Sequence, residues 1–87
     1  MQEESKKLYK ITGKILADRR KELGIKYTDF CYGNDIPMST YDVIISGSAK
    51  SSFYNIAKVV KASKMTFKEF GEALDNNLPD DFLNSDN

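Results

Sequence analysis

The sequence predicts an all-α fold, a compact bundle of five short helices in a single domain. In successive segments the apolar residues recur at spacings of three and four, the period of a helix that buries one face. No segment alternates polar and apolar residues with the period of a strand. A chain of 87 residues buries only about 60% of its unfolded surface, so one small core is expected.

The first helix is expected over residues 5–23, with Ser5 capping its start and Gly24 ending it. Gly13 lies in its middle, where glycine costs up to about 1 kcal/mol relative to alanine. It therefore marks either a close approach of another helix or a later start of the regular helix. The apolar stripe consists of Leu8, Ile11, Ile15, Leu16 and Leu23.

Residues 27–46 predict two short helices joined by a tight turn. The first helix runs from Tyr27 to about Gly33 and the second from about Met38 to Ser46. Between them, residues 34–37 tolerate or impose turn dihedrals, and the proline is expected in the first turn of the second helix. This is the arrangement that a helix-turn-helix needs to place its second helix in a DNA major groove. The residues expected to pack inward are Phe30, Cys31, Ile36, Tyr41 and Ile44.

Two further helices are expected after a small polar loop. One runs from Phe53 to about Ala62 after a cap at Ser51 or Ser52, and one from Phe67 to about Asn76 behind a capping box. The capping box pairs Thr66 with Glu69, and the predicted apolar stripes comprise Phe53, Ile56, Ala57, Val59, Val60, Phe67, Phe70 and Leu74.

The predicted helix-turn-helix domain covers residues 5–76, and residues 77–87 are expected to form a flexible acidic tail. Phe82 and Leu83 in that tail could dock on a partner. All 13 lysines and arginines lie in residues 1–68 with seven acids, whereas residues 69–87 hold six acids and no base. A basic body with an acidic tail is typical of polyanion binding, and chance placement of solvated charges is the alternative.

Composition argues against several functional classes. The chain has no histidine, one cysteine, no glycine-rich phosphate loop and no paired carboxylates in an apolar setting, so we expect no enzyme and no metal or other cofactor. Cys31 is expected as a small buried hydrophobe. No apolar run approaches the roughly 20 residues that cross a bilayer, and the first residues are polar. The expectation is a cytoplasmic protein with no membrane contact.

A longer pattern appears when residues 16–70 are read as one string. Its apolar and turn positions are similar, without a gap, to those of the Cro/repressor-like, or Xre-like, helix-turn-helix family. The positions that carry the resemblance are Leu16, Arg20, Leu23, Gly24, Ile25, Phe30, Cys31, Ile36, Ser39, Thr40, Tyr41, Ile44, Gly47, Phe53, Ile56, Ala57, residues 58–62, Met65, Thr66, Phe67 and Phe70.

The resemblance implies a lambda-repressor-like DNA-binding domain that acts as a transcriptional regulator, with repression as the expected mode. It implies a homodimer on double-stranded operator DNA, with helix 38–46 in the major groove. Tyr27 would anchor a phosphate. Bases would be read by Met38, Ser39, Asp42 and Val43, and phosphates contacted by Ser46, Ser48 and Lys50. Thr40 adds a hydroxyl to this face, and Lys26 and Arg20 add positive charge near it.

The helix expected in the groove lacks the Arg, Gln and Asn side chains that grip guanine or adenine edges. Asp42 would face phosphates unfavourably unless it accepts a hydrogen bond from a cytosine amino group. Ile45 stands where the family often has a Glu that pairs with the residue matching Arg20. That arginine is therefore free to reach a phosphate or Glu22, or to be solvated.

Two readings of the surface residues stay open. The basic residues either bind phosphates or form the solvated faces of helices; they are Lys6, Lys7, Lys10, Lys14, Arg19, Arg20, Lys26 and Lys50. Val43 and Ile45 add apolar surface beyond what the core needs. The alternative to a DNA-binding regulator is thus a protein-interaction module or an antitoxin with a degenerate helix-turn-helix, whose partner would be a toxin or another protein.

Overall fold

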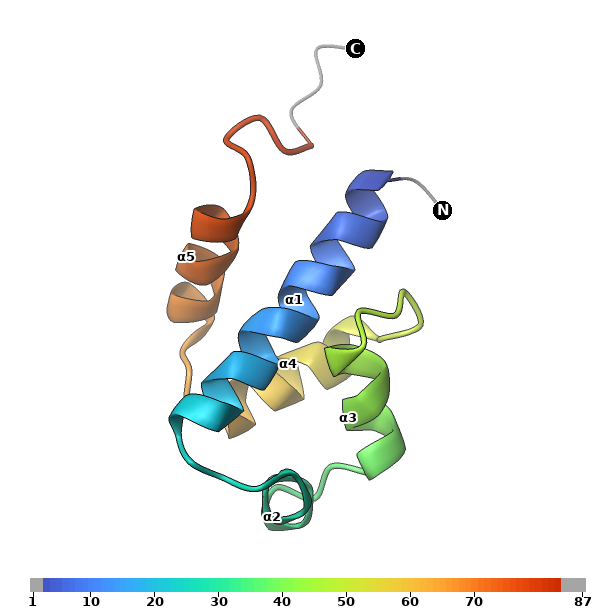
Figure 1. Ribbon diagram of the computed structural model, residues 1–87, viewed down its shortest axis with the longest axis vertical. Helices are drawn as coiled ribbons and strands as arrows, with labels where there is room; N and C mark the ends of the chain where they lie inside the picture. The colour runs from blue at the N-terminus through green and yellow to red at the C-terminus, as the bar shows by residue number, and fades with distance from the viewer. Residues whose placement is uncertain (1–2, 84–87) are drawn as a thin grey trace.

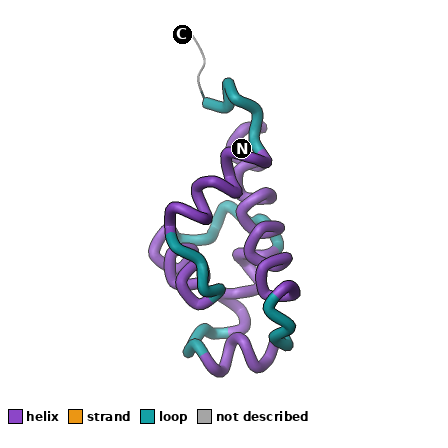
Figure 2. Tube along the Cα trace, turned by 90° about the vertical axis from the view of Figure 1, so that its left-hand side faces the viewer, coloured by secondary structure: helices purple, strands orange, loops and turns teal. Residues whose placement is uncertain are grey.

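The computed structural model describes residues 3–83, which form five α-helices and no strand (Figures 1 and 2). The predicted all-α, five-helix bundle is confirmed. The longest helix, α1, runs between α5 on one side and α3 on the other, with α2 at the end of the molecule (Figure 1). The helices are α1 Glu3–Glu22, α2 Tyr27–Gly33, α3 Met38–Ile45, α4 Phe53–Ala62 and α5 Phe67–Asn77.

The start of α1 differs from the prediction. Ser5 was expected as its N-cap, and this is wrong, because the helix already includes Glu3 and Glu4 in its first turn. Carboxylates there interact favourably with the positive end of the helix dipole. Gly13 consequently lies well inside a regular helix, which excludes the later start that its position allowed.

Four helices end in the same way, with one residue in the left-handed backbone region. Gly24 and Gly47 take this position after α1 and α3, with φ of 70° and 78°. Asp35 and Lys64 take it after α2 and α4. The following N–H then bonds back to a carbonyl five residues earlier, a Schellman arrangement that turns the chain sharply. These hydrogen bonds join Ile25 to Arg20, Ile36 to Cys31, Ser48 to Val43 and Met65 to Val60.

The helix starts divide into two kinds. Ser52, one of two predicted candidates, accepts the Asn55 N–H and caps α4, and the predicted capping box of Thr66 and Glu69 is present on α5. Its hydrogen bonds lower the pKa of Glu69. By contrast, α2 and α3 have no side-chain cap, and Pro37 is the N-cap of α3 rather than part of its first turn. Tertiary packing must therefore hold these two short helices.

The core forms where α1 to α4 meet, and it contains the five inward-facing residues predicted for residues 27–46. Burial raises the pKa of the Cys31 thiol, so the uncharged thiol is favoured, in keeping with its prediction as a small buried hydrophobe. The buried apolar residues are Leu16, Phe30, Cys31, Ile36, Tyr41, Ile44, Val59 and Val60.

Two residues of the predicted apolar stripes lie on the surface. Phe53 is 86% exposed and Phe67 57% exposed, so their assignment to the apolar stripes is wrong. Each is the first residue of its helix, so it projects past the neighbouring helices that cover the next turns. The Lys61 ammonium lies 5.3 Å from the centroid of the Phe67 ring, a cation–π contact.

The backbones of α1 and α3 approach closely at two glycines. A Cβ at Gly13 would lie 2.6 Å from the Ile44 carbonyl oxygen and 2.8 Å from that of Ile45. A Cβ at Gly47 would lie 2.9 Å from the Lys10 Cα. Of the two alternatives for Gly13, the close approach of another helix is thus confirmed. It also corrects the expectation for Ile45, which is partly buried and packs against the core rather than adding surplus surface.

The segment after α5 turns back toward the start of α1. The Phe82 N–H bonds to the Pro79 carbonyl at 3.0 Å, and the Leu83 N–H bonds to Glu4 Oε2 at 3.0 Å. The predicted domain end at residue 76 falls one residue before the end of α5. Of the predicted tail, residues 84–87 lie outside the described residues, and its flexibility stays a prediction. Within residues 3–83, no helix has the length and apolar character needed to cross a membrane.

We predict that Gly13→Ala lowers the free energy of unfolding by about 1–2 kcal/mol. The added methyl meets backbone carbonyls that cannot rotate away, and overpacking costs about 1–3 kcal/mol against a helix-propensity gain of up to about 1 kcal/mol. Urea denaturation followed by circular dichroism measures the difference. The matched control is Gly71→Ala in α5, where the new Cβ would meet no atom within 4 Å beyond its chain neighbours and the backbone of its own helix, so the stability is expected to rise slightly. Equal stability of the two variants would contradict the steric account.

Candidate nucleic-acid interface

The helix α3 has one face in the core and one face in solvent. Tyr41 and Ile44 are buried, whereas Met38, Ser39 and Asp42 are exposed. The exposed residues are spaced by three and four, which places them on one side of the helix. The predicted base-reading residues therefore share one surface, with Val43 half-buried at its edge. We call this surface, formed by Met38, Ser39, Asp42, Val43 and Ser46, the outer face of α3.

Tyr41 attaches the buried side of α3 to α1 and α2. Its ring centroid lies 5.1 Å from that of Phe30 and 5.6 Å from that of Tyr27. Its hydroxyl accepts a 3.0 Å hydrogen bond from Arg20 Nε. Burial raises the pKa of Tyr41, although the guanidinium opposes that shift. A buried phenol thus has both its apolar ring and its polar end satisfied.

This contact corrects the expectation for Arg20. Besides Tyr41, the guanidinium donates to the Ile25 carbonyl at 2.9 Å, so it neither pairs with Glu22 nor is left to solvent. A half-buried guanidinium needs acceptors, and these two supply them. Two of its five donors are thus used within the molecule, and its place among the DNA-facing residues stays a prediction. The sequence contained one indication of this contact, which was Tyr41, because the hydroxyl of a core tyrosine needs a hydrogen-bond partner.

Tyr27 and Asp42 join the start of α2 to the outer face of α3. The Tyr27 hydroxyl donates to Asp42 Oδ1 and also lies 3.4 Å from the Met38 carbonyl oxygen. This hydrogen bond is the main cause that raises the pKa of Tyr27 to about 12. The predicted phosphate anchor is near α3 as expected. A phosphate, however, would have to compete with the Asp42 carboxylate for its proton.

The loop after α3 offers fewer free hydroxyls than predicted. Ser46 Oγ donates to the Val43 carbonyl at 2.9 Å, so its proton is used within the molecule. Ser48 Oγ accepts the Lys50 N–H at 3.1 Å, which leaves the Ser48 proton available. Lys50 is exposed. Of the predicted phosphate contacts in this loop, Ser48 and Lys50 therefore keep free donors.

A groove of about 200 Å³ runs between α3 and the start of α4. It brings predicted residues together with two that sequence reasoning missed, Ser51 and Asn55. Their contribution depends on how α4 crosses α3, for which the local sequence has no signal. The groove is lined by Ser39, Thr40, Val43, Ile44, Lys50, Ser51 and Asn55.

The predicted basic residues separate into paired and unpaired groups. Arg19 donates to the Ser63 carbonyl at 3.1 Å, at the end of α4, and Lys14 pairs with Asp18 at 2.7 Å. Lys6 lies 4.0 Å from Glu3. Of the predicted basic residues, those whose side chains form no hydrogen bond or ion pair within residues 3–83 are Lys7, Lys10, Lys26 and Lys50.

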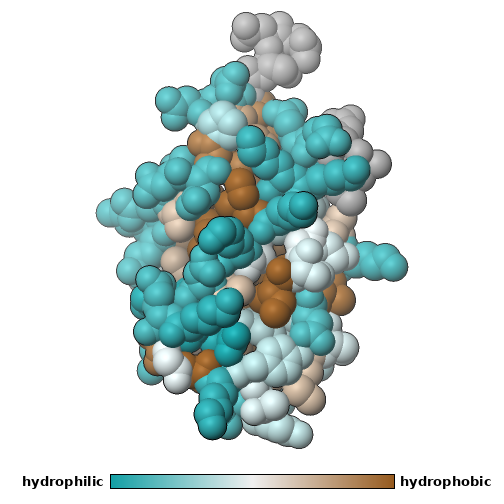
Figure 3. Space-filling model, in the orientation of Figure 1, coloured by the Kyte–Doolittle hydropathy of each residue, from teal (hydrophilic) through white to brown (hydrophobic). Residues whose placement is uncertain are grey.

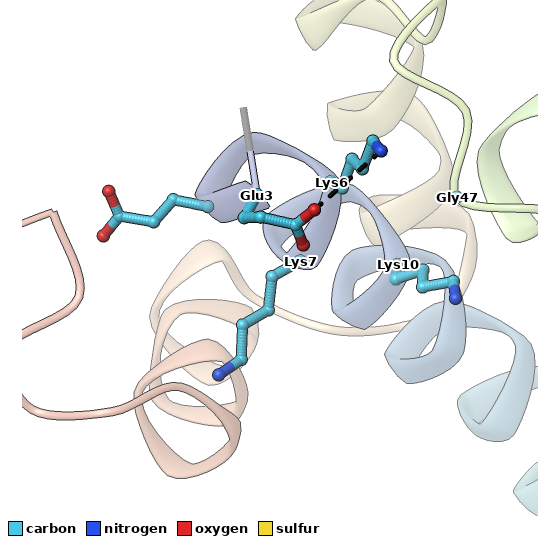
Figure 4. A pocket seen from close by; sticks show the side chains of 6 residues that line it. Glu3, Lys6, Lys7, Lys10 and Gly47 are labelled. Carbon is cyan, nitrogen blue, oxygen red and sulfur yellow. Dashed lines mark ion pairs between the residues drawn. The ribbon is translucent and has the colours of Figure 1, made fainter. Parts of the chain in front are cut away.

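A second, larger cleft of about 600 Å³ lies where the first half of α1 meets the end of α3 (Figure 4). Lys6 and Lys10 extend from α1 on the side of Gly47, whereas Lys7 points away from it. Lys10 therefore lies next to the α3–α4 connection and adds positive charge there. The cleft is lined by Glu3, Glu4, Lys6, Lys7, Lys10 and Gly47.

Apolar surface gathers elsewhere, among α1, α4 and α5. Figure 3 shows hydrophilic residues over most of one face, with hydrophobic residues between α1 and α5. A groove of about 190 Å³ is lined by Leu8, Tyr9, Thr12, Ser51, Phe53, Ile56, Phe70 and Leu74. This surface is distinct from the outer face of α3.

Among residues 3–83, no three carboxylate, thiol or imidazole groups lie close enough together to hold a metal ion. Comparison with known protein families, with curated proteins and with solved structures found no match. The resemblance to the Cro/repressor-like family therefore stays a prediction from the register of residues 16–70.

We predict that Asp42→Ala lowers the pKa of Tyr27 from about 12 toward the usual 10, because the hydrogen bond to Asp42 is its main cause. The bond stabilises the fold fully below pH 10. Its contribution is lost as the pH rises toward 12, since the unfolded chain then releases the phenol proton first. The ring signals of Tyr27 in NMR spectra between pH 10 and pH 12 measure the titration.

Asp29→Ala is the control for this experiment. Asp29 is an aspartate like Asp42, but it lies on α2 and forms no hydrogen bond with Tyr27. It should leave the Tyr27 titration unchanged. An unchanged titration in Asp42→Ala would show that the phenol proton is not held by Asp42.

Proposed function

We propose that this protein is a sequence-specific, double-stranded DNA-binding transcriptional regulator that acts in the cytoplasm and places α3 in the major groove. The observation that carries the proposal is the position of α3. Its buried side is fixed by Tyr41, its outer face is open, and unpaired lysines lie on both flanks. Lys26 precedes Tyr27 at the start of α2, and Lys50 follows α3 in the next loop.

The dimensions of α3 support this use. With its side chains an α-helix is about 10–12 Å across, and eight residues make α3 about 12 Å long. The major groove of B-DNA is about 12 Å wide and admits a single α-helix. The outer face would meet base edges with two short polar side chains, Ser39 and Asp42, and with apolar atoms of Met38 and Val43. Such apolar atoms suit thymine methyl groups.

The phosphate contacts would come from the flanks of α3. Lys26 and Lys50 supply ammonium groups, Ser48 supplies a hydroxyl, and the groove between α3 and α4 adds Asn55. Lys10 extends this charge toward α1 (Figure 4). Phosphate contacts of this kind set affinity and orientation, whereas base contacts set specificity.

Regulation would follow from occupancy of a promoter, with repression by occlusion as the expected mode. One α3 covers only a few base pairs, so two copies on a near-palindromic site would make the recognised sequence long enough to be rare. In such dimers the half-sites lie about one helical turn apart. We therefore include a homodimer in the proposal.

A second candidate, a protein-interaction module such as an antitoxin, is favoured by one specific observation. The Tyr27 hydroxyl is bonded to the Asp42 carboxylate, which puts negative charge on the surface that phosphates would approach. Exposed aromatic side chains outside α3 offer protein-binding surface, among them Tyr32, Phe53 and Tyr54. A protein-interaction module could function without any affinity for duplex DNA, whereas the leading proposal requires that the protein binds duplex DNA at low salt.

We predict that Lys50→Ala weakens binding to all duplexes and reduces the slope of log K against log salt concentration by about one. The reason is the loss of one phosphate contact. Fluorescence titrations of labelled duplexes at several salt concentrations measure the slope. Lys68→Ala is the control, because Lys68 lies on α5, on the other side of α1 from α3 (Figure 1). Equal effects of the two substitutions would place the duplex elsewhere on the molecule.

We further predict that Ser39→Ala changes sequence preference while leaving the salt slope unchanged. The Ser39 hydroxyl is exposed on the outer face of α3 and forms no hydrogen bond within residues 3–83. It is therefore free for a base edge. Selection of bound sequences from a random duplex pool compares the two proteins. A changed salt slope with unchanged preference would instead assign Ser39 to a phosphate.

A further inference from the structure

Asp42 is the only charged residue of α3, and its side chain has a defined orientation. It is exposed on the outer face and accepts the hydrogen bond of Tyr27 through Oδ1. Tyr27 is in turn placed by its edge contact with the buried Tyr41 ring, at 5.6 Å between centroids. The carboxylate is therefore positioned by the core, through one intermediate side chain.

The hydrogen bond leaves part of the carboxylate free. Within residues 3–83, Asp42 Oδ2 has no hydrogen-bond or ion-pair partner, and no lysine or arginine pairs with Asp42. The Tyr27 hydroxyl keeps its proton at neutral pH, since its pKa is about 12, and so remains a donor to Oδ1. The outer face of α3 thus presents a pre-oriented acceptor that cannot donate.

The four bases respond differently to such an acceptor. In the major groove cytosine presents the N4 amino donor, whereas guanine presents two acceptors, N7 and O6. Thymine presents the O4 acceptor and a methyl group, and adenine combines the N7 acceptor with one donor. A carboxylate therefore has a matching partner in cytosine and is repelled by guanine and thymine.

We propose that Asp42 selects cytosine in the major groove and that Tyr27 is the positioning residue that aims its carboxylate. This inference rests on the proposed function, which it deepens by naming the class of duplex bound: one with a C·G pair opposite the middle of α3. The selection works largely by rejection. The carboxylate lowers affinity for every duplex through repulsion by phosphates, and a cytosine amino group offsets that loss most fully, because adenine places the N7 acceptor beside its own amino donor.

Selection from a random duplex pool tests the proposal with three proteins: wild type, Asp42→Asn and Tyr27→Phe. Wild type should enrich sites with an invariant C·G pair, and replacing that pair should weaken binding about tenfold. Asp42→Asn should shift the preference toward adenine, because an amide both donates and accepts. Tyr27→Phe keeps the ring against Tyr41 but frees the carboxylate, so it should reduce the cytosine preference without changing the salt slope.

The outcomes separate this inference from the proposed function. Binding of wild type and Asp42→Asn with the same preference would overturn the inference and leave the DNA-binding proposal standing. Full cytosine preference in Tyr27→Phe would overturn the role of Tyr27. Absence of wild-type binding to any duplex at low salt would overturn the proposed function, and the inference with it. Circular dichroism of each variant confirms the helical content, and Lys68→Ala on α5 is the control that should keep the cytosine preference.

Discussion

The structure depends on the direct contact between the backbones of α1 and the end of α3. Gly13 admits the carbonyls of Ile44 and Ile45, and Gly47 admits the Lys10 backbone, so the two backbones lie closer together than a Cβ at either position would allow. The contact fixes the direction of α3. Since α3 is too short to be stable alone and has no side-chain cap, its conformation is set by this packing rather than by its own propensity.

A second set of contacts converts that position into a defined surface. The Arg20 guanidinium holds the buried hydroxyl of Tyr41, and the Tyr41 ring supports Tyr27, whose hydroxyl holds Asp42. A continuous series of side chains thus runs from α1 through the core to the outer face of α3. In the proposed regulator this series would hold the base-reading side chains in defined positions. The affinity of the outer face for DNA would be low, because this face carries a carboxylate and no cation.

The fold was predictable because hydrophobic spacing and turn residues act locally. They placed α2 and α4 correctly and the ends of α3 and α5 within one residue. Interactions between distant residues were not predictable in this way. Arg20 was expected to be free because its family partner is absent at Ile45, yet Tyr41 supplies an acceptor. Phe53 and Phe67 fit the helical period but fall at helix starts that no other helix covers. At the candidate interface, the outer-face residues followed from their spacing, whereas the Tyr27–Asp42 bond and Asn55 depend on how helices cross.

Amide NMR spectra of the isotope-labelled protein, recorded with and without duplexes selected from a random pool at low salt, test the central claim most directly. The account predicts that the largest shifts fall at the start of α2, along the outer face of α3 and in residues 46–52, with α5 nearly unchanged. The buried amides of Tyr41 and Ile44 should shift less than those of Ser39 and Asp42. Shifts concentrated on α5 and the apolar groove among α1, α4 and α5, or no shifts at all, would contradict it.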